Sequence, residues 1–597
     1  MMSLKVWKYV LSILILFGII SLLYNIAIGK NWNYNTVSVL DEVQTWSRSS
    51  RLSERLLTFQ QYHTYCPHLA KPLSLEDEVE ERKLLNSIIW PQLPSGSAPP
   101  SLLQTSDPVH SRFTIVTSKI KPSWYVGDQL EVQIQLRDFK GQPKRYGGDL
   151  LLARLHSPKY EAGVAGQVLD HENGLYTVRF PLLWEGSAQV DVMMVHSSEA
   201  IAVLRRLRDH RLDRVRFTST FRQGDQSEKM MCHICLPPEP GPICNFTDVR
   251  TGEPWYCYKP KMLSCDTRYN HAMGGYAIDL LTDEETLLFQ NGKNVKVPIQ
   301  ASTMDTINVL PSSKGTANLP TDTSAFYFLI HIIVLVINVD KGSQKPDPVK
   351  LATSGYYYQG SWRPLDGVPM GQFNDSSAIT QCLTNKSVYL YGDSTMRQWY
   401  EYFSSMLPDL KKFYLGKPIK LGPFLAVDTK HNMLLWYRIH GPPMRTQWVM
   451  SNDLRYIANE LDGLTGSRDT VVALSIWAHF TTLPVEVYIN RLRDIRKAVV
   501  RLLNRAPGTL VVIRTANPQS LEQDVSLYNS DWFSLQQDMV LRAMFKGLNV
   551  RFVDAWQMVV AHHEPHNLHP LRPIVKTMVD MMLSYICPHR SSNNVGI

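Results

Sequence analysis

Ser394 lies where a strand-like run of residues gives way to a helix-like one. The segment 388–403 reads VYLYGDSTMRQWYEYF, and Gly392, Asp393 and Ser394 form the break in it. A serine hydroxyl acts as a nucleophile when a base takes its proton and hydrogen-bond donors stabilise the oxyanion. At the end of a strand it would face the crevice in which open α/β sheets bind ligands, beside the N–H groups of the next helix. Asp and Ser are also common helix caps, so capping is the alternative interpretation.

A histidine-rich segment near the C-terminus offers a base for that hydroxyl. Residues 552–570 read FVDAWQMVVAHHEPHNLHP and carry His562, His563, His566 and His569 after a predicted strand. We take His569 as the candidate base, because imidazole is the commonest general base. These spacings match no standard zinc signature, so we expect no metal site. A metal-dependent hydrolase built on these histidines is the alternative.

Strand-like and helix-like segments alternate from about residue 355 onward, and they would position both side chains. The strand-like runs SVYLYGDS, TVVALSIW, TLVVIRT and NVRFVDAW are separated by helix-like runs such as PVEVYINRLRDIRKAVVRLLNRAPG and DWFSLQQDMVLRAMFKG. Pro484 near the start and Gly508 past the end mark the limits of the longest helix. This alternation predicts a largely parallel sheet covered by helices, which is a three-layer α/β domain over residues 355–590.

Residues 105–230 follow a different pattern, with a period of two. In LEVQIQL, Leu130, Val132, Ile134 and Leu136 alternate with polar residues, as a half-buried strand requires. The Asn-Gly turn in HENGLYTVRF and the alternation in SAQVDVMMV indicate further short strands. The pattern predicts an antiparallel β-sandwich of the immunoglobulin-like type. No catalytic side chains gather here, so binding or spacing is the expected role.

The cysteines predict disulfide bonds once the chain is placed in an oxidising compartment. Five of them crowd residues 232–265, and we expect a small disulfide-held module over residues 231–300. In the cytosol, the run CHIC would raise zinc or redox chemistry instead. Cys382 and Cys587 bracket the α/β domain and are predicted to pair. The expected disulfide-bonded set is Cys66, Cys232, Cys235, Cys244, Cys257, Cys265, Cys382 and Cys587.

The N-terminal segment predicts entry into the secretory pathway. Between Lys8 and Lys30 runs YVLSILILFGIISLLYNIAIG, which is uncharged and long enough to cross a bilayer as a helix. The basic residues before it would stay cytoplasmic, so residues 1–30 are expected to form a cytoplasmic tip and a type II signal anchor, with the Golgi membrane as the expected location. A cleaved signal, which would give a secreted protein, is the alternative.

Charge and sequons agree with that placement. The net charge of +8 arises from 62 basic and 54 acidic residues that are interspersed, so we expect no nucleic-acid partner.

A stem and linker should follow the anchor over residues 31–104. A second linker over residues 301–354 contains the run AFYFLIHIIVLVINV at 325–339, which is shorter than a bilayer span and is expected to be an inserted or buried strand-like segment. The candidate glycosylation sites are Asn245, Asn374 and Asn385.

These motifs carry a resemblance to a known family. YGDSTMR with the late HNLHP, preceded by YYYQGSWRPLDG, resembles the PC-esterase branch of the GDSL/SGNH-type serine hydrolases. The β-rich and cysteine-rich part before them resembles neurexophilin. The order of the two parts is similar to that of the neurexophilin and PC-esterase domain family, and the similarity covers most of the chain after about residue 105.

The resemblance implies a role for the Gly-Asp-Ser motif. Gly392, Asp393 and Ser394 match it, with Ser394 as the nucleophile, and Arg397 matches a GDSxxR pattern in which it would add positive charge for the oxyanion. A surface ion pair is the alternative role of Arg397. The block that usually carries further oxyanion donors reads SIWAHF here. The nearest polar candidates are Ser475, His479 and Asn517.

The resemblance also implies a late Asp-x-x-His that supplies acid and base. His569 matches the histidine, but His566 stands where the pattern has Asp. A neutral imidazole cannot stabilise an imidazolium as a carboxylate does, so Asp554 or Glu564 would have to substitute. We favour Asp554, because a strand end is more rigid than the loop HHEP. A structural hydrogen bond at the strand end is its alternative role.

The function implied by the resemblance is acyl transfer in the secretory lumen. We expect an O-acetyltransferase or O-acetylesterase that acts on glycan hydroxyls, with sialic acid on a glycoprotein or glycolipid as the candidate acceptor. No bound cofactor is expected, and acetyl-CoA is the candidate donor. The alternative is a non-catalytic extracellular glycoprotein in which the β-sandwich binds a cell-surface receptor and the esterase-like domain is degenerate.

Overall fold

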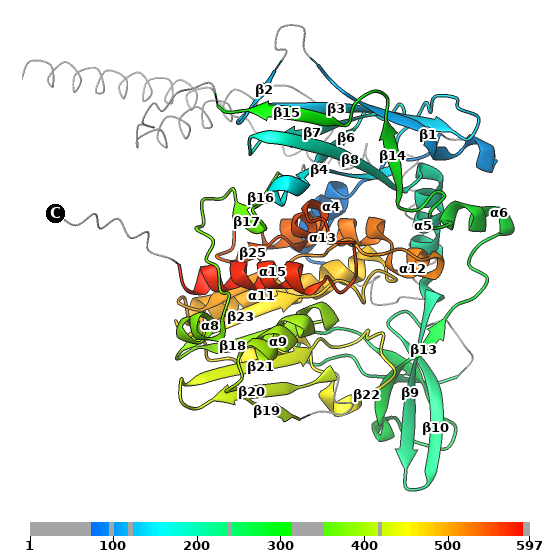
Figure 1. Cartoon of the computed structure of the whole chain (residues 1–597). Coiled ribbons are helices and arrows are strands. Elements are labelled where there is room, and N and C mark those ends of the chain that lie inside the picture. Colours follow the sequence, from blue (N-terminus) through cyan, green and yellow to red (C-terminus); the bar gives the residue numbers. More distant parts are fainter. Residues whose placement is uncertain are drawn as a thin grey trace, which may run out of the picture. The chain divides into compact units, whose positions relative to one another are not determined.

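Figure 1 shows the computed structural model of the chain, which describes residues 73–94, 101–117, 123–236, 241–312, 352–415 and 421–588. The expected signal anchor, Cys66 and the apolar segment 325–339 lie outside these described residues. Among the described helices, none has the length and apolar character of a membrane span. All described residues belong to one of the chain's two units, Tyr65–Ile597.

The N-terminal half of the described chain is built mainly from β-strands. Its first sheet contains twelve strands, namely β1 (Ser106–Ile115), β2 (Trp124–Tyr125), β3 (Gln129–Asp138), β4 (Leu150–Ser157), β5 (Ala162–Ala165), β6 (Gln167–Asp170), β7 (Leu175–Pro181), β8 (Gly186–His196), β14 (Val297–Ala301), β15 (Thr306–Leu310), β16 (Gly355–Tyr358) and β17 (Ser361–Pro364). They run in the order β17-β16-β5-β4-β8-β14-β1-β3-β7-β6, and β15 pairs with β8 and β2. Neighbours are antiparallel except β1 with β14 and β15 with β2.

Strand β3 shows why this region folds as a sheet. The side chains of Leu130, Val132, Ile134 and Leu136 are fully buried, and the residues between them are partly or fully exposed. The buried four belong to one hydrophobic cluster with residues of β4, β7 and β8. Each side chain of this size contributes about 1.5–3 kcal/mol when it is removed from water. The predicted alternation and the antiparallel pairing are therefore confirmed for this strand.

The cysteine-rich segment forms part of a second sheet. This sheet runs in the order β11-β12-β10-β9-β13-β22, with β9 (Val215–Gln223), β10 (Gln226–His233), β11 (Ile243–Asn245), β12 (Tyr256–Tyr258), β13 (Asn270–Tyr276) and β22 (Val449–Met450). Disulfide bonds join Cys232 to Cys257 and Cys244 to Cys265. Cys235 is also disulfide-bonded. The expected disulfide-held unit is thus built on strands, and Cys232 and Cys257 are directly opposite each other on β10 and β12.

The C-terminal half is a mixed α/β region around a third sheet. The sheet runs in the order β19-β20-β21-β18-β23-β24-β25, with β18 (Ser387–Gly392), β19 (Lys411–Tyr414), β20 (Phe424–Asp428), β21 (Met433–Ile439), β23 (Thr470–Ser475), β24 (Leu510–Arg514) and β25 (Arg551–Val553). The strands from β21 to β25 are parallel, and β19 and β20 are antiparallel additions. All six residues of β23 are buried, as in a strand that is covered on both faces. The predicted, largely parallel sheet is confirmed.

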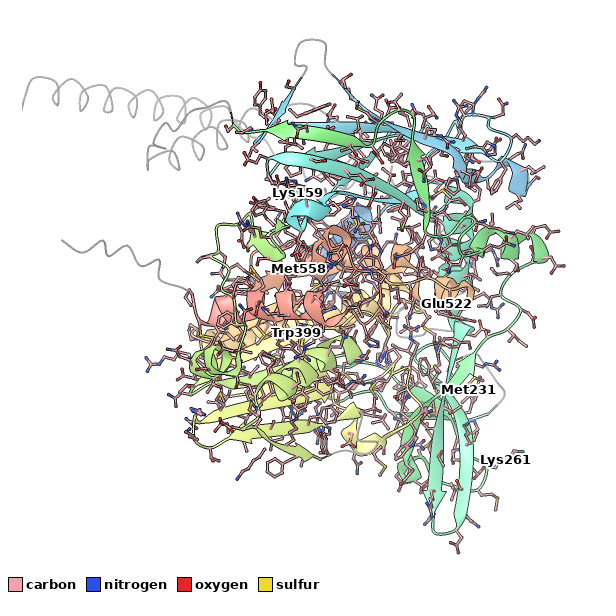
Figure 2. The ribbon with its side chains drawn as sticks, in the orientation of Figure 1. Lys159, Met231, Lys261, Trp399, Glu522 and Met558 are labelled. Carbon is pink, nitrogen blue, oxygen red and sulfur yellow. A yellow bond between two sulfur atoms is a disulfide. The ribbon has the colours of Figure 1, made fainter. Side chains whose placement is uncertain are left out.

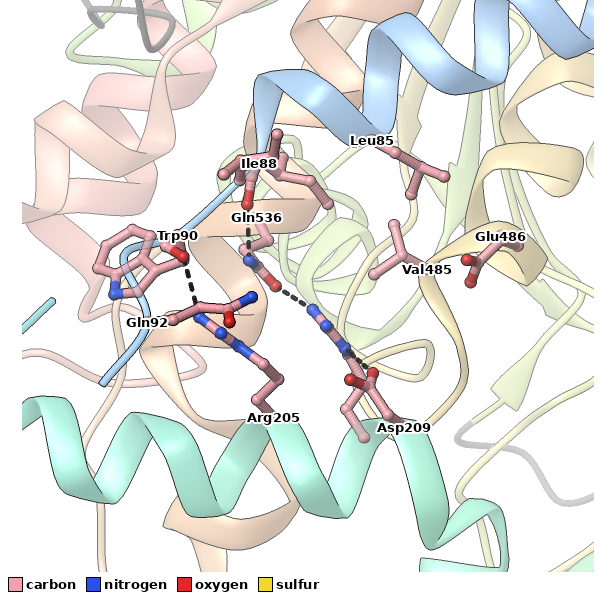
Figure 3. Close-up of a pocket in the computed structure, with 11 residues that line it drawn as sticks. Leu85, Ile88, Trp90, Gln92, Arg205, Asp209, Val485, Glu486 and Gln536 are labelled. Carbon is pink, nitrogen blue, oxygen red and sulfur yellow. Dashed lines mark hydrogen bonds and ion pairs between the residues drawn. The ribbon is translucent and has the colours of Figure 1, made fainter. Parts of the chain in front are cut away.

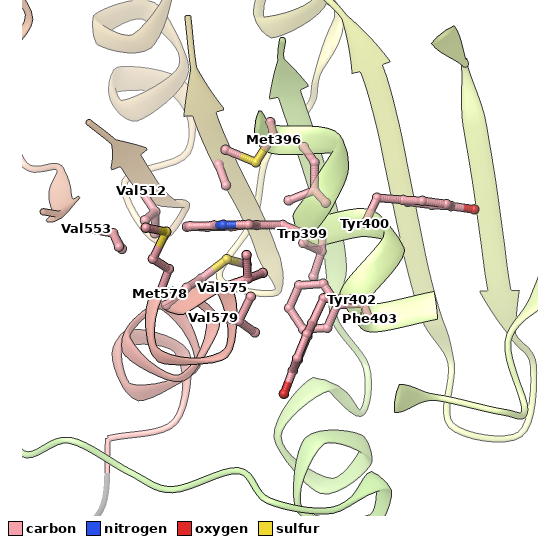
Figure 4. Close-up of a cluster of buried hydrophobic side chains, with 14 of the residues drawn as sticks. Met396, Trp399, Tyr400, Tyr402, Phe403, Val512, Val553, Val575, Met578 and Val579 are labelled. Carbon is pink, nitrogen blue, oxygen red and sulfur yellow. The ribbon is translucent and has the colours of Figure 1, made fainter. Parts of the chain in front are cut away.

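Helices connect and cover these strands. They are α4 (Leu75–Ser87), α5 (Ser198–His210), α6 (Asp283–Thr286), α8 (Ser376–Leu383), α9 (Ser394–Met406), α10 (Ile457–Gly463), α11 (Val485–Arg505), α12 (Gln523–Asn529), α13 (Asp531–Phe545), α14 (Ala555–Ala561) and α15 (Arg572–Ile586). Trp399 of α9 is fully buried in a cluster with Met396, Val512 and Met578 (Figure 4). The predicted disulfide between Cys382 and Cys587 joins α8 to the residue after α15.

Strand pairing crosses the limits that the sequence predicts for the domains. The strand β14 spans the predicted boundary at residue 300 and β15 lies beyond it, yet both pair with β8. The strand β16 opens the predicted α/β domain, yet it pairs with β5. The helix α14, which carries Met558, contacts β4 and β5 (Figure 2). The β-rich half (residues 101–312) and the α/β half (residues 352–588) therefore share sheets and packing surfaces, and the side chains at that junction belong to both.

Candidate active site

Ser394 lies at the junction of β18 and α9, where the sequence predicts it. The strand β18 ends at Gly392, and a Cβ atom on this residue would collide with the carbonyl oxygen of Ser475 in β23. Glycine permits this close approach of two backbones. Asp393 is the N-cap and Ser394 the first residue of α9. The Ser394 hydroxyl therefore lies at the carboxyl edge of parallel strands, where open α/β sheets bind ligands.

Asp393 has a structural role within the motif. One of its carboxylate oxygens accepts hydrogen bonds from the N–H and the hydroxyl of Thr395, at 2.9 and 2.6 Å. The other accepts from the backbone N–H groups of Trp477 and Ala478, at 3.4 and 3.2 Å. The side chain is fully buried. Asp393 therefore caps α9 and ties it to the segment after β23, which leaves the hydroxyl of Ser394 to a different partner.

That partner is His569. Its Nε2 atom lies 2.7 Å from the Oγ of Ser394, across 175 positions of sequence. Both residues are partly exposed. A hydroxyl within hydrogen-bonding distance of an imidazole nitrogen is the arrangement of a serine nucleophile and its general base.

The protonation state of His569 suits a base. Burial lowers the pKa of the imidazole below its ordinary value, because the charged form is poorly solvated. The negative charge of Asp393 raises this pKa and the positive charge of Arg397 lowers it, each by less than burial does. His569 is therefore neutral at pH 7 and can accept the proton of Ser394.

Hydrogen bonds from α9 and from the segment after β24 hold residues 562–570, here called the histidine loop. Asn517 donates through Nδ2 to the carbonyl oxygen of Asn567 at 2.9 Å, and Gln398 donates through Nε2 to that of Pro570 at 3.1 Å. The Oδ1 of Asn567 accepts from the N–H of His569 at 3.1 Å. Asn517 was an oxyanion candidate, but its amide nitrogen binds two carbonyl groups. It positions the loop instead.

The expected acid, Asp554, binds other partners. Its Oδ1 accepts hydrogen bonds from Nη2 of Arg542 at 2.7 Å and from the N–H of Gln557 at 3.0 Å. Asp554 is the N-cap of α14. The carboxylate thus makes structural hydrogen bonds at the end of the strand, which was the alternative role. This corrects the expectation that it would face His569.

Glu564 and His566 do not bind His569 either. The carboxylate of Glu564 lies 3.8 Å from the imidazole of His563, and the N–H of Glu564 donates to Nδ1 of His562. His566 binds Lys296 through Nδ1. Within the part of the chain that the structure describes, His569 therefore has no carboxylate hydrogen-bond partner.

The donors for an oxyanion are fewer than the resemblance implies. The N–H of Ser394 makes no backbone hydrogen bond within the described residues and is the first donor of α9. Arg397 donates through Nε to Glu401 at 3.0 Å, the surface ion pair that was its alternative role. The hydroxyl of Ser475 lies 3.2 Å from that of Thr395 and is buried. The N–H of Ser394 is thus the best placed donor.

A pair of histidines that sequence reasoning did not single out as a pair, the buried His440 and the partly exposed His479, adjoins the site. Nδ1 of His440 lies 2.6 Å from the carbonyl oxygen of Gly441, so this nitrogen carries the hydrogen. Its Nε2 must then accept from Nδ1 of His479, at 3.0 Å. In this tautomer Nε2 of His479 has a lone pair and cannot donate to an oxyanion. The feature of the sequence that could have identified this pair is the position of His440, which directly follows β21, the neighbour of β18.

The imidazoles of this pair are neutral. Burial lowers the pKa of His440 to about 4, and the positive charge of Arg491 acts in the same direction. Burial, followed by the effect of His440, also lowers the pKa of His479 well below its ordinary value. The pair can therefore accept a hydrogen bond from a substrate hydroxyl but adds no positive charge to the site.

The described residues contain one group that could hold a metal ion, and it lies outside the histidine loop. It consists of Asp409, Asp428 and His431. Asp428 already accepts hydrogen bonds from the N–H groups of Lys430 and His431 and from the His431 ring. These bonds give the carboxylate a turn-forming role.

A cavity of about 270 Å³ lies among α4, α5, α11 and α13 (Figure 3). Arg205 donates to the carbonyl oxygen of Trp90 at 3.1 Å, and Gln536 donates to that of Ile88 at 3.1 Å. Neither Ser394 nor His569 lines this cavity. The candidate site around Ser394 therefore lies outside this cavity.

The three sequons lie at the surface. Asn245, Asn374 and Asn385 are all exposed, so their side chains are accessible for glycan attachment. The Oδ1 of Asn245 accepts from the N–H and hydroxyl of Thr247, at 2.9 and 2.6 Å. Exposure is the property that the glycosylation prediction requires, and modification at these positions remains a prediction.

Comparison with protein families yields two matches that follow each other along the chain. The model described as Neurexophilin matches residues 97–285, and the model described as NXPE family member 4-like, C-terminal domain, matches residues 362–587. Ser394 and His569 lie within the second match. The disulfide bonds and these two domain types indicate a secretory-pathway or secreted protein. The chain belongs to the neurexophilin and PC-esterase domain (NXPE) family.

Proposed function

We propose that the chain is a lumenal serine acyl-transfer enzyme, an O-acetyltransferase or O-acetylesterase that acts on glycan hydroxyls. The observation that carries this proposal is the 2.7 Å hydrogen bond between Oγ of Ser394 and Nε2 of His569. Membership of the PC-esterase-related NXPE family supports it, because both residues lie in the matched C-terminal domain.

The proposed reaction uses His569 twice. Its Nε2 takes the hydroxyl proton while Oγ of Ser394 bonds to the acetyl carbonyl carbon, and the N–H of Ser394 and the positive end of α9 stabilise the oxyanion. The bond to the donor's leaving group then breaks, and the leaving group takes the proton from His569. A sugar hydroxyl, or water in an esterase, next gives its proton to His569 and attacks the acetyl group. Ser394 regains its proton as it departs.

The proposed substrates are anionic. Sialic acid on a glycoprotein or glycolipid is the proposed acceptor, and acetyl-CoA is the proposed donor. Two arginines on the segments that carry the reactive pair support this choice. Arg397 is one helical turn after Ser394, and Arg572 follows the histidine loop, where its guanidinium lies 5.3 Å from the ring centre of Tyr402. Positive charge beside a site attracts anionic substrates.

The finer architectural assignments belong to the same proposal. The first sheet would be an immunoglobulin-like sandwich, and the third sheet with its helices would be a three-layer SGNH-type domain. Residues 1–30 would anchor the protein in the Golgi membrane as a type II protein, with the described residues in the lumen. The placement of disulfides in both halves supports a lumenal position.

A non-catalytic receptor-binding glycoprotein is the second candidate. The observation that favours it is that His569 has no carboxylate partner among the described residues. Changing the acid of a serine triad to its amide lowers kcat about 10⁴-fold, because the imidazole takes the wrong tautomer. In this case the β-rich half would bind a cell-surface receptor and the α/β half would be a scaffold.

The test uses the purified full-length protein with acetyl-CoA and a sialylated glycoprotein, beside the variant Ser394→Ala. Acetyl transfer by the wild type that is lost in the variant supports the proposal. Equal transfer by both proteins refutes the role of Ser394. If neither protein transfers acetyl groups or hydrolyses an O-acetylated sialoside, the enzyme proposal fails and receptor capture by the β-rich half becomes the experiment for the second candidate.

A further inference from the structure

The histidine loop is bound by two cationic side chains from the β-rich half. Nζ of Lys296 lies 3.0 Å from Nδ1 of His566 and 2.7 Å from Oδ2 of Asp531 in α13. Arg154 of β4 donates through Nη1 to the carbonyl oxygen of His562 at 2.6 Å. The loop that carries His569 is therefore attached to both halves of the protein.

Lys296 is held firmly in place. It directly precedes β14, which pairs with both β1 and β8 in the first sheet. Its backbone has a φ of 53°, in the left-handed region that residues other than glycine rarely adopt. The surrounding strands must stabilise this conformation. Lys296 thus extends from a rigid strand start, and its side chain is 10% exposed beside the fully buried Asp531.

The contact with Lys296 determines which ring nitrogen of His566 carries the hydrogen. A lysine ammonium group only donates hydrogen bonds, so Nδ1 of His566 accepts and its hydrogen is on Nε2. Burial, followed by the positive charges of Lys296 and Arg154, lowers the pKa of His566 well below its ordinary value. His566 is therefore neutral at pH 7, and the hydrogen bond from Lys296 persists. The position at which the family pattern has an acid serves here to attach the loop to the other half.

The loop is held on both sides of its reactive residue. The β-rich half binds its first part at His562 and His566, and the α/β half binds its last part at Asn567 and Pro570. His569 lies within the last part, three residues after the contact with Lys296. The orientation of its ring toward Ser394 thus depends on contacts from both halves.

We propose that Lys296 is a positioning residue for His569, which makes the β-rich half part of the active-site framework as well as a binding region. This inference rests on the proposed acyl-transfer function. Displacement of a reacting group by about 1 Å lowers rates about 10²-fold. Loss of the contact is therefore expected to slow acylation of Ser394 by about ten- to a hundred-fold.

The test variant is Lys296→Met combined with Asp531→Asn. Removing both charges avoids an unpaired buried carboxylate, and the amide oxygen introduced at position 531 can still accept from the N–H of Gln519, which binds Asp531 at 2.9 Å. The matched control is Lys144→Met with Glu199→Gln. Lys144 and Glu199 also form a buried pair, within the β-rich half, where Lys144 binds the carbonyl oxygen of Gln104 as well. Neither control residue contacts the histidine loop.

The measurement is the rate at which a fluorophosphonate probe labels Ser394 in the full-length protein. The final extent of labelling reports the folded fraction, and the rate reports the positioning of His569. We expect the test variant to label at least tenfold more slowly to the same extent, and the control variant and Lys296→Arg, which keeps a donor, to label at about the wild-type rate.

Two results would overturn the inference alone, provided that wild-type labelling depends on Ser394. One is a wild-type rate in the test variant, and the other is an equal loss of rate in the control variant. If the wild type labels no faster than Ser394→Ala, the proposed function fails and the inference falls with it.

Discussion

The two halves of the protein use polar side chains in different ways. In the β-rich half, the ammonium group of Lys144 is surrounded by Glu199, the hydroxyl of Tyr146 and a backbone carbonyl oxygen, so its donors are satisfied. In the α/β half, His569 binds only the hydroxyl of Ser394 through its ring, as far as the described residues show. A satisfied network stabilises the fold, whereas an imidazole that has a single, weakly acidic partner can exchange a proton with it.

The largest effect should follow from replacing His569, the side chain with a single hydrogen-bond partner. His569→Gln is expected to lower the rate of Ser394 acylation about 10³-fold, because no general base remains. The free energy of unfolding should change little, since the ring makes its hydrogen bond only with the partly exposed Ser394. Probe labelling and chemical denaturation of the same samples measure both quantities. His563→Gln, in the same loop and 70% exposed, is the control, and a similar loss of rate there would contradict the prediction.

Breaking the hydrogen-bond network around Lys144 should have the opposite effect, a loss of stability without a loss of labelling rate. Lys144→Met is expected to lower the free energy of unfolding by about 3–5 kcal/mol, because it leaves Glu199 charged, buried and without its cation. The labelling rate of the molecules that remain folded should not change. Adding Glu199→Gln should restore most of the stability. Denaturant unfolding of the three proteins checks this order, and a double variant no more stable than Lys144→Met would refute the explanation.

The disulfides extend the comparison to covalent links. The Cys382–Cys587 bond spans 205 residues and the Cys232–Cys257 bond spans 25. The chain-entropy model gives about 5 kcal/mol for the longer loop and about 3.5 kcal/mol for the shorter one. Replacing both cysteines of each pair by serine should therefore destabilise the α/β half by roughly 1.5–2 kcal/mol more than the β-rich half. Equal losses in thermal unfolding of the two variants would argue against a loop-length origin.

Local pattern was enough to predict that the first half is rich in β-strands and that the second half is a mixed α/β region. The alternation at Leu130, Val132 and Ile134 is visible in five residues of sequence, and it fixes which face of β3 is buried. The partners of the strands were not predictable in the same way. The pairings of β14 with β8 and of β16 with β5 join segments about 105 and 190 residues apart, and many short apolar strands satisfy the same local pattern.

The meeting of Ser394 and His569 could be predicted, but the residues around them could not. Ser394 comes just after β18, and His569 comes after β25 and the short helix α14; the carboxyl ends of parallel strands share one edge of the sheet. Lys296 lies in a polar run, NGKNVK, that resembles any exposed turn, and its partner His566 is 270 residues away. Asp554 stands directly before the helix-like run AWQMVV. An Asp in that position commonly caps a helix, so the sequence favoured capping over the role of catalytic acid.

The smallest expected effect concerns the pH dependence of the reactive pair. The pKa of His569 lies below 6.5, mainly through burial, so the labelling rate should rise with pH through that lowered value and then level off. The charge of Arg397 contributes to the lowering. Arg397→Gln should therefore move the midpoint upward, toward the ordinary histidine value. Arg179→Gln, which removes a surface ion pair with Glu131 in the β-rich half, should leave the midpoint unchanged. A downward shift for Arg397→Gln, or the same shift for both variants, would show that the midpoint does not report His569.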